Sequence, residues 1–231
     1  MEVKSFQVGA IGTNCYFVGD EATKRGCLID PGDEGARLIR EWEAFGYTLE
    51  AILLTHGHYD HTTALPELAR AFPAVPVYSK REDVCEGGSP AFYQCMSVPS
   101  MRYVQDGDTI TVGSLVFTVL ETPGHTPGSV VFKAAVALFT GDTLFAGSCG
   151  RVDFPGGDWG QMCASLRRLA ALEGDYKVYP GHEWTSTLEQ ERRSNPLCAR
   201  RCSWGTYEAA ADRTQLPVRR GADHDGALSR G

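Results

Sequence analysis

Five of the six histidines of this chain fall in three short motifs. The first motif is Thr-His-Gly-His-Tyr-Asp-His at residues 55–61, and Pro-Gly-His occurs at 123–125 and again at 180–182. Imidazole nitrogens and carboxylate oxygens are ligands that Zn²⁺ and similar ions prefer in proteins. The motifs therefore predict a site for one or two metal ions, with the candidate ligands His56, His58, Asp60, His61, His125, Asp142 and His182.

The spacing inside the first motif favours two ions rather than one. In an extended loop, side chains two positions apart project to the same side, so His56 and His58 can reach one ion. Asp60 and His61 come where the chain turns into a helix and can reach a second ion. A polar loop with solvent-facing histidines is the alternative, and four ligand-type side chains in six residues disfavour it.

The three later candidates are ambiguous when each is taken alone. A single histidine in a Pro-Gly turn, such as His125 or His182, is more often structural. An aspartate after glycine, as in Thr-Gly-Asp at 140–142, is usually a turn residue or a helix cap. Their combination with the first motif favours metal binding.

The elements that must position these residues alternate between strands and helices. Residues 51–54 are a wholly apolar run, typical of a strand buried on both faces, and the first motif follows directly. The apolar periodicity predicts further strands at 4–8, 14–18, 26–29, 75–78, 109–112, 115–120, 130–133, 135–139 and 177–179. It predicts helices at 33–45, 62–72, 159–172 and 185–193. The segment 82–99 is irregular and is expected to form a loop or short helices over the site.

Bulk properties narrow the class of protein. A chain of 231 residues suits one α/β domain, and a net charge of −7 disfavours nucleic acid and anionic membranes as partners. There is no stretch of 18 apolar residues and no leader pattern at the start, so we expect a cytoplasmic protein. The eight irregularly spaced cysteines are then expected to be reduced. We expect residues 1–198 to form the domain and 199–231 to be a polar, poorly ordered tail.

The quoted motifs resemble those of the metallo-β-lactamase superfamily, and within it the glyoxalase II-like (hydroxyacylglutathione hydrolase-like) group. The resemblance covers about residues 1–198. It implies an α/β fold, a four-layer αββα sandwich with the metals at one edge of two sheets.

The resemblance also implies a role for each ligand. His56, His58 and His125 would hold the first metal, Asp60, His61 and His182 the second, and Asp142 would bridge both. Two divalent ions are implied, zinc above all, with iron or manganese also compatible with these ligands. Asp60 and Asp142 are the implied catalytic side chains, and Asp30 the implied support of the ligand loop. A cysteine usually replaces Asp142 in true β-lactamases, so antibiotic hydrolysis is not expected as the main role.

Residues 144–154 are similar to a stretch beside the metals in glyoxalase II enzymes. We predict substrate contacts from Arg151, Cys149 and Tyr59. Arg151 could bind a substrate carboxylate with its planar fork, or it could pair with Asp153 and hold the loop. Cys149 could equally be a packing residue.

The resulting prediction is a hydrolase of small thioesters, with metal-bound hydroxide attacking the thioester carbonyl. Glyoxalase II has a C-terminal helical domain that helps bind glutathione. The recognisable fold here is expected to end near residues 195–196, and the short tail that follows is unlike that domain, which puts strong glutathione binding in doubt. An iron-dependent persulfide dioxygenase, using the equivalents of His56, His125 and Asp142, is the main alternative. A non-catalytic metal-binding module and an RNase Z-like nuclease are less favoured. The expected partner is a small-molecule thioester, and the sequence does not predict the oligomeric state.

Overall fold

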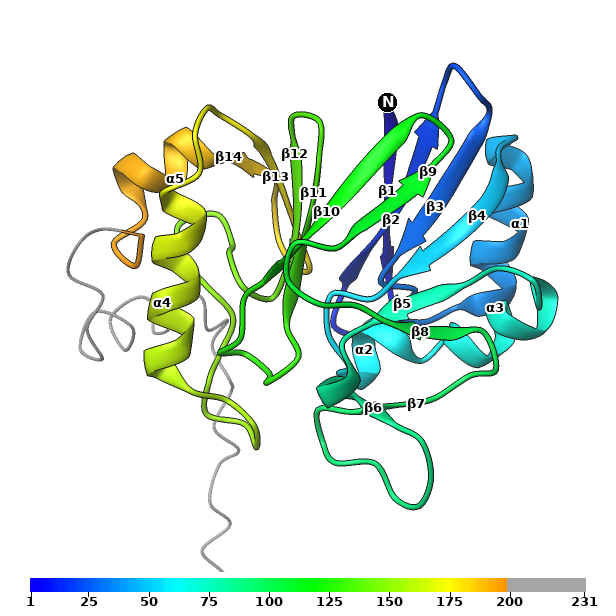
Figure 1. The fold of residues 1–231 in the computed structure, drawn as a ribbon, viewed down its shortest axis with the longest axis horizontal. Coiled ribbons are helices and arrows are strands. Elements are labelled where there is room, and N and C mark those ends of the chain that lie inside the picture. Colours follow the sequence, from blue (N-terminus) through cyan, green and yellow to red (C-terminus); the bar gives the residue numbers. More distant parts are fainter. Residues whose placement is uncertain (199–231) are drawn as a thin grey trace, which may run out of the picture.

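Two six-stranded β-sheets face each other, and helices cover their outer faces (Figure 1). This computed structural model describes residues 1–198, so the predicted tail at 199–231 lies outside the described residues. The arrangement is the four-layer αββα sandwich that the sequence resemblance implies.

The first sheet combines antiparallel and parallel pairs. Its first three strands form an antiparallel meander, and the remaining strands add to it in parallel. In spatial order the strands are β1 (Glu2–Val8), β2 (Thr13–Asp20), β3 (Arg25–Ile29), β4 (Thr48–Leu53), β5 (Val77–Ser79) and β8 (Met101–Tyr103).

The second sheet runs through the later half of the chain. Strands β9 to β12 pair antiparallel, β13 joins β12 in parallel, and β14 closes the edge. In chain order they are β9 (Thr109–Val112), β10 (Leu115–Glu121), β11 (Val130–Ala134), β12 (Ala137–Gly141), β13 (Lys177–Pro180) and β14 (Ser186–Thr187).

The helices lie on opposite sides of the sheet pair (Figure 1). On the first sheet are α1 (Gly35–Phe45), α2 (Tyr59–Thr62) and α3 (Leu65–Ala71); on the second are α4 (Trp159–Ala170) and α5 (Leu188–Ser194). Helix α1 ends as its sequence predicts, because Gly46 takes the left-handed conformation with φ of 76°. Asp158 caps the start of helix α4: its side chain accepts a hydrogen bond from the Gln161 N–H.

Strand alternation divides the interior into three apolar layers. In β2, Phe17 packs with Trp42 of α1, whereas Tyr16 and Val18 face the second sheet. In β12, Phe139 faces the first sheet and the neighbouring Leu138 packs with α4. Each sheet is therefore buried on both faces, which makes the strands rigid supports for the loops at their ends.

The structure differs from the prediction in three places. The helix predicted at 62–72 begins only at Leu65, with Pro66 in its first turn where the missing N–H is tolerated, and a separate short helix, α2, ends at Thr62. Strand β8 and the two-stranded pair β6 (Val84–Cys85) and β7 (Cys95–Met96) are too short to show a period in sequence. The last helix begins at Leu188, since residues 186–187 pair with β13.

The cysteines only partly follow the prediction. Six of them are free thiols, namely Cys15, Cys27, Cys85, Cys95, Cys149 and Cys198. Cys163 is disulfide-bonded, so the prediction of reduced cysteines throughout is wrong at this residue. Within residues 1–198, every helix is too short or too polar to cross a membrane.

Candidate metal centre

All seven predicted ligands come shortly after strands, five of them on loops and Asp60 and His61 in the short helix α2. The first motif follows β4, His125 follows β10, Asp142 follows β12 and His182 follows β13. Strand β12 is parallel to β13, so the loops after them emerge at the same end of the second sheet. Loops at strand carboxyl ends are the usual place for sites in α/β folds.

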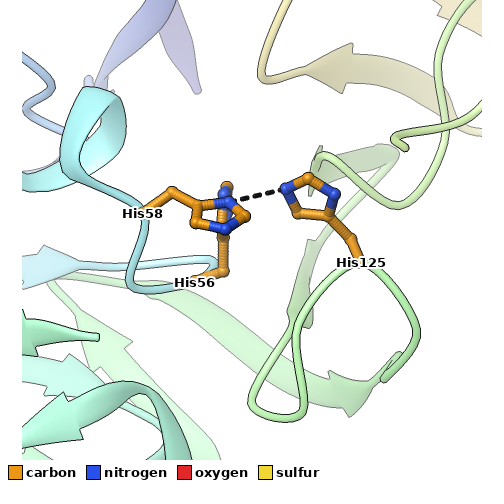
Figure 2. Close-up of side chains that lie close together, drawn as sticks. All are labelled: His56, His58 and His125. Atoms are coloured by element: carbon orange, nitrogen blue, oxygen red, sulfur yellow. Dashed lines mark hydrogen bonds between the residues drawn. The ribbon is translucent and has the colours of Figure 1, made fainter. Parts of the chain in front are cut away.

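Three imidazoles form the first group. His56, His58 and His125 are buried, and one ring nitrogen of each lies within 4.8 Å of the other two. Figure 2 shows that His58 and His125 approach from different loops, with Nδ1 of His58 at 2.8 Å from Nε2 of His125. This set of nitrogens could hold one metal ion.

Asp60, His61 and His182 form a second group. Their candidate ligand atoms also lie within 4.8 Å of one another. Nε2 of His182 lies 3.2 Å from Oδ2 of Asp60 and 3.4 Å from Nε2 of His61. Thr13 Oγ1 donates to Oδ2 of Asp60 at 2.9 Å and so fixes this carboxylate.

The carboxylate of Asp142 lies between the two groups. Its Oδ2 is 3.4 Å from Nε2 of His125 in the first group and 3.5 Å from Nε2 of His182 in the second. Its Oδ1 is 3.4 Å from Nε2 of His61. One carboxylate can therefore reach a cation in either group.

Several buried polar atoms at this place have no hydrogen-bond partner among the described residues. They are Nε2 of His56, Nε2 of His58 and Oδ1 of Asp142. A buried polar atom without a partner costs roughly 1–3 kcal/mol of stability. A cation bound among these lone pairs would remove that cost for Nε2 of His56 and Oδ1 of Asp142, so these residues fit a metal ion.

The opposite nitrogens of three rings are already engaged. Nδ1 of His61 lies 2.9 Å from Oδ2 of Asp30, and Nδ1 of His125 donates to the Arg151 carbonyl at 2.7 Å. Thr55 Oγ1 donates to Asp30, so Nδ1 of His56, 3.1 Å from that oxygen, is the donor to it. In His56 and His125 the proton is thus on Nδ1, which leaves Nε2 as a metal-binding lone pair, and in His61 the Nδ1 bond to Asp30 leaves Nε2 as the atom that faces Asp142.

Electrostatics at the centre favour neutral imidazoles in the first group. Burial lowers the pKa of His56 well below its usual value and the pKa of His58 to about 4. A neutral imidazole is the form that binds a metal, so these rings are ready at neutral pH.

The second group favours positive charge. Burial by itself lowers the pKa of His61 and His182, but the Asp142 carboxylate outweighs it and raises both. Burial would raise the pKa of Asp142, yet the adjacent His182 and His61 hold it well below its usual range. Asp142 is therefore a buried, ionised carboxylate, and a buried charge of this kind is stabilised by a cation beside it.

Gly181 allows the last ligand loop to approach so closely. A Cβ at Gly181 would overlap Oδ1 of Asp142 and would lie 2.6 Å from Cε1 of His61. The Pro-Gly-His motif at 180–182 therefore needs glycine for space, a reason that the sequence did not reveal.

The predicted substrate contacts lie around the ligands. The Arg151 guanidinium donates to both carboxylate oxygens of Asp153, at 2.7 and 2.6 Å, and lies 3.7 Å from the centre of the Phe154 ring. This is the loop-holding pair that was the alternative for Arg151. Cys149 is buried in the apolar layer beneath α4, and Tyr59 is 61% exposed. The three substrate roles stay predictions.

Sequence reasoning missed two aromatic residues beside the first group. The centre of the Phe92 ring lies 5.5 Å from that of His58 and 4.9 Å from that of Phe154. Phe92 belongs to the irregular 82–99 segment, whose aromatic content was the available signal. It also missed Asp83, which nothing in its local sequence distinguishes.

Residues 8–182 match the profile of the Metallo-beta-lactamase superfamily. The chain belongs to this superfamily. It is 35% identical over 209 residues to hydroxyacylglutathione hydrolase GloC of Haemophilus influenzae, which covers 85% of this chain and 98% of that protein.

Solved structures of the superfamily are also similar. The B3 metallo-beta-lactamase BLEG-1 has a TM-score of 0.76 at 31% identity, over 85% of this chain and 99% of that one. TTHA1623 in a di-iron-bound form has a TM-score of 0.71 at 34% identity, over 84% and 98%. ETHE1 from Myxococcus xanthus has a TM-score of 0.74 at 32% identity, over 94% and 93%.

Proposed function

We propose that this protein is a hydrolase of small thioesters that uses two divalent metal ions, similar to hydroxyacylglutathione hydrolases. One observation carries the proposal: the Asp142 carboxylate lies within 3.5 Å of ring nitrogens from both ligand groups. The likeness to hydroxyacylglutathione hydrolase GloC, at 35% identity over nearly all of that protein, supports the thioester class.

The chain supplies a complete ligand set for this chemistry. His56, His58 and His125 would hold one ion, Asp60, His61 and His182 the other, and Asp142 both. When bound, a pair of ions supplies a water nucleophile at neutral pH and polarises the substrate carbonyl. Zinc is the metal we propose first, because neutral imidazoles and carboxylates suit it.

Asp60 has the properties of a proton acceptor in this reaction. Burial would raise its pKa, but His182 and His61 lower it, so the carboxylate is ionised at neutral pH. Thr13 holds one oxygen in place at 2.9 Å. We assign to Asp60 the proton released when water attacks the carbonyl; as the C–S bond breaks, this proton passes to the departing sulfur, which leaves as a thiol.

The surroundings of the first group suit a small, partly apolar acyl group. Phe92 and Phe154 form an edge-to-face pair beside His58, with ring centres 4.9 Å apart. Such a surface removes water from the reacting carbonyl and strengthens the polar contacts within the site. A cytoplasmic location for this protein stays a prediction from the sequence.

The iron-dependent persulfide dioxygenase remains the alternative. It needs only the equivalents of His56, His125 and Asp142 on one iron. In this chain a second group, containing His182, is also assembled, and one-iron chemistry gives that group no role.

Metal analysis combined with an activity panel tests the proposal. Protein loaded separately with Zn²⁺, Fe²⁺ or Mn²⁺ is assayed for metal per chain, for hydrolysis of S-D-lactoylglutathione and of a thioester without glutathione, and for persulfide-dependent oxygen uptake. We expect two ions per chain and thioester hydrolysis. One iron per chain with oxygen uptake, and no hydrolysis, would establish the alternative instead.

The matched pair Asp142→Ala and Asp106→Ala sharpens this test. Loss of Asp142 should reduce binding of both ions and abolish hydrolysis, because one carboxylate serves both groups. Asp106 is an exposed carboxylate paired with Arg168, and its loss should change neither property. Retained hydrolysis in Asp142→Ala, with only one ion lost, would show that Asp142 is not shared.

A further inference from the structure

The Asp83 carboxylate is fully buried where two ligand-bearing loops meet, and no step proposed above uses it. Its Oδ2 accepts hydrogen bonds from the Gly57 N–H at 3.0 Å and from Thr126 Oγ1 at 2.6 Å. Its Oδ1 accepts one from the Gly128 N–H at 2.8 Å. One side chain thus binds three donors on two separate loops.

These donors are neighbours of the first group of ligands. Gly57 stands between His56 and His58, and Thr126 directly follows His125. Asp83 itself comes from a third element, the 3₁₀ turn η1 (Arg81–Asp83). The carboxylate therefore fixes the His56–His58 loop relative to the His125 loop, whose imidazoles lie 2.8 Å apart at their nearest nitrogens.

The packing around Asp83 leaves little freedom for another arrangement. A Cβ at Gly57 would overlap the Asp83 backbone carbonyl, and a Cβ at Gly128 would lie 2.6 Å from Oδ1 of Asp83. Thr126 is held a second time by Ser129, whose Oγ lies 2.6 Å from Thr126 Oγ1. A change in this carboxylate therefore moves the loops themselves.

The chemistry at this position requires an acceptor with two free oxygens. A carboxylate accepts from all sides, whereas an amide turns an NH₂ group toward one of the two loops. That NH₂ would face either the Gly57 N–H or the Gly128 N–H, so one loop would lose its bond. An ionised carboxylate is also costly to bury, which makes it a poor choice for fold stability alone.

We propose that Asp83 is a positioning residue that sets the separation of His58 and His125 and so controls the metal affinity of the first group. The inference rests on the metal centre proposed above. It extends that proposal to a residue that touches no metal.

The test is a titration of metal-free protein with Zn²⁺ in competition with a chromophoric chelator. We expect two sites in the wild type. In Asp83→Asn we expect the affinity of one site to fall by about tenfold to a hundredfold, the scale for losing an outer support of metal ligands. The other site, formed by Asp60, His61 and His182, should keep its affinity to within about threefold, well below the tenfold loss that marks a lost outer support.

Asp20→Asn is a matched control. Asp20 is also a buried aspartate that joins two loops, accepting from Thr23 Oγ1 at 2.6 Å and from the Ser114 N–H at 2.6 Å. It lies at the opposite end of β2 from Thr13, the residue that contacts Asp60. Its replacement should lower the melting temperature and leave both zinc affinities unchanged.

Thr126→Val covers the case in which Asp83→Asn does not fold. It removes one of the three donors and should give a smaller loss at the same site, whereas Thr126→Ser should restore wild-type affinity.

The outcomes separate this inference from the proposed function. A wild type that binds no zinc contradicts the proposed function. A wild type with two sites, and an Asp83→Asn variant with two unchanged sites, overturns only the role of Asp83. Equal losses at both sites in Asp83→Asn, or the same loss in Asp20→Asn, would show that general stability controls metal binding, and would also overturn it.

Discussion

The carboxylate of Asp30 determines which nitrogen of His61 faces the metal centre. Oδ2 of Asp30 lies 2.9 Å from Nδ1 of His61, and Nε2 of the same ring lies 3.4 Å from Oδ1 of Asp142. Because the Asp30 carboxylate accepts, Nδ1 of His61 carries a proton, and Nε2 is the atom of this ring that is placed to bind a metal. An aspartate that precedes its histidine by 31 positions thus sets that histidine's tautomer.

Asp30→Asn should weaken metal binding by the second group. The asparagine amide can keep the bond to the Thr55 N–H, which Oδ1 of Asp30 now accepts at 2.8 Å, but its NH₂ then faces Nδ1 of His61. The ring proton would move to Nε2 and block that ligand atom. We expect a loss of about tenfold to a hundredfold in zinc affinity at one site. Asp33→Asn, at an exposed position of the same loop, is the control, and equal losses in both variants would contradict the prediction.

Gly181→Ala should reduce metal content without unfolding the protein. The new methyl group would overlap Oδ1 of Asp142 and press on His61, so these ligands must move apart. Gly181 is buried, but residues 183–185 of the same loop are exposed and can shift outward, so the melting temperature of the metal-free protein should fall by only a few degrees, about 1 kcal/mol. Metal per chain and metal-free melting temperature are the measurements. Gly87→Ala, where the added Cβ meets nothing within 4 Å, should change neither, and a normal metal content in Gly181→Ala would show that the loop adapts.

Arg151→Ala tests whether the Arg151 guanidinium binds a substrate carboxylate. Its fork is bound to Asp153, and both side chains are about half exposed. A substrate carboxylate must compete with that pair, so we expect about a tenfold loss in kcat/KM, at the lower end of the range for a charged hydrogen bond. The loss should appear for a carboxylate-bearing thioester and not for an uncharged one, with metal content unchanged. Equal losses on both substrates would assign Arg151 to the structure of the loop, and Asp153→Ala would then reproduce them.

The free energy of unfolding of the metal-free protein should contain a contribution from Asp83 that changes between about pH 4 and pH 6. Burial raises the pKa of Asp83 to about 6, above the value of roughly 3.9 expected when unfolded. The folded state therefore binds the proton more tightly, and the contribution of Asp83 to the free energy of unfolding falls as pH rises through this window. The total fall is at most about 3 kcal/mol, from about 1.4 kcal/mol for each pKa unit.

Urea unfolding of wild type and Asp83→Asn at several pH values measures this contribution as a difference. The difference between wild type and variant should decrease from pH 4 to pH 6, because asparagine does not titrate. The Cys95 thiol near Asp83 stays neutral throughout, since burial raises its pKa to about 12, and Glu82 is the other acidic neighbour. Asp20→Asn should behave oppositely: Thr23 and Ser114 lower the pKa of Asp20, so its contribution is lost as pH falls below 4. A flat difference for Asp83 would mean that its carboxylate is not desolvated.

The sequence by itself determined the candidate ligands and the general plan of this protein. His56, His58, Asp60 and His61 lie within six residues, so their common direction follows from local chain geometry. The strands and helices that carry them are long enough to show apolar periodicity, and the resemblance to the superfamily supplied the four-layer arrangement. The short strands β6, β7 and β8 contain too few residues to show a period and were missed.

Only the tertiary structure decided how the ligands are supported. Asp83 reaches Gly57 across 26 positions of sequence and Gly128 across 45, and Asp30 reaches His61 across 31. The sequence left two partners open for Arg151, a substrate carboxylate or Asp153. In the structure Arg151 pairs with Asp153, and the Phe154 ring packs against its guanidinium. The contacts of Asp83 and Asp30 join elements from different parts of the chain. No local pattern encodes them, because they depend on how the sheets and loops come together in three dimensions.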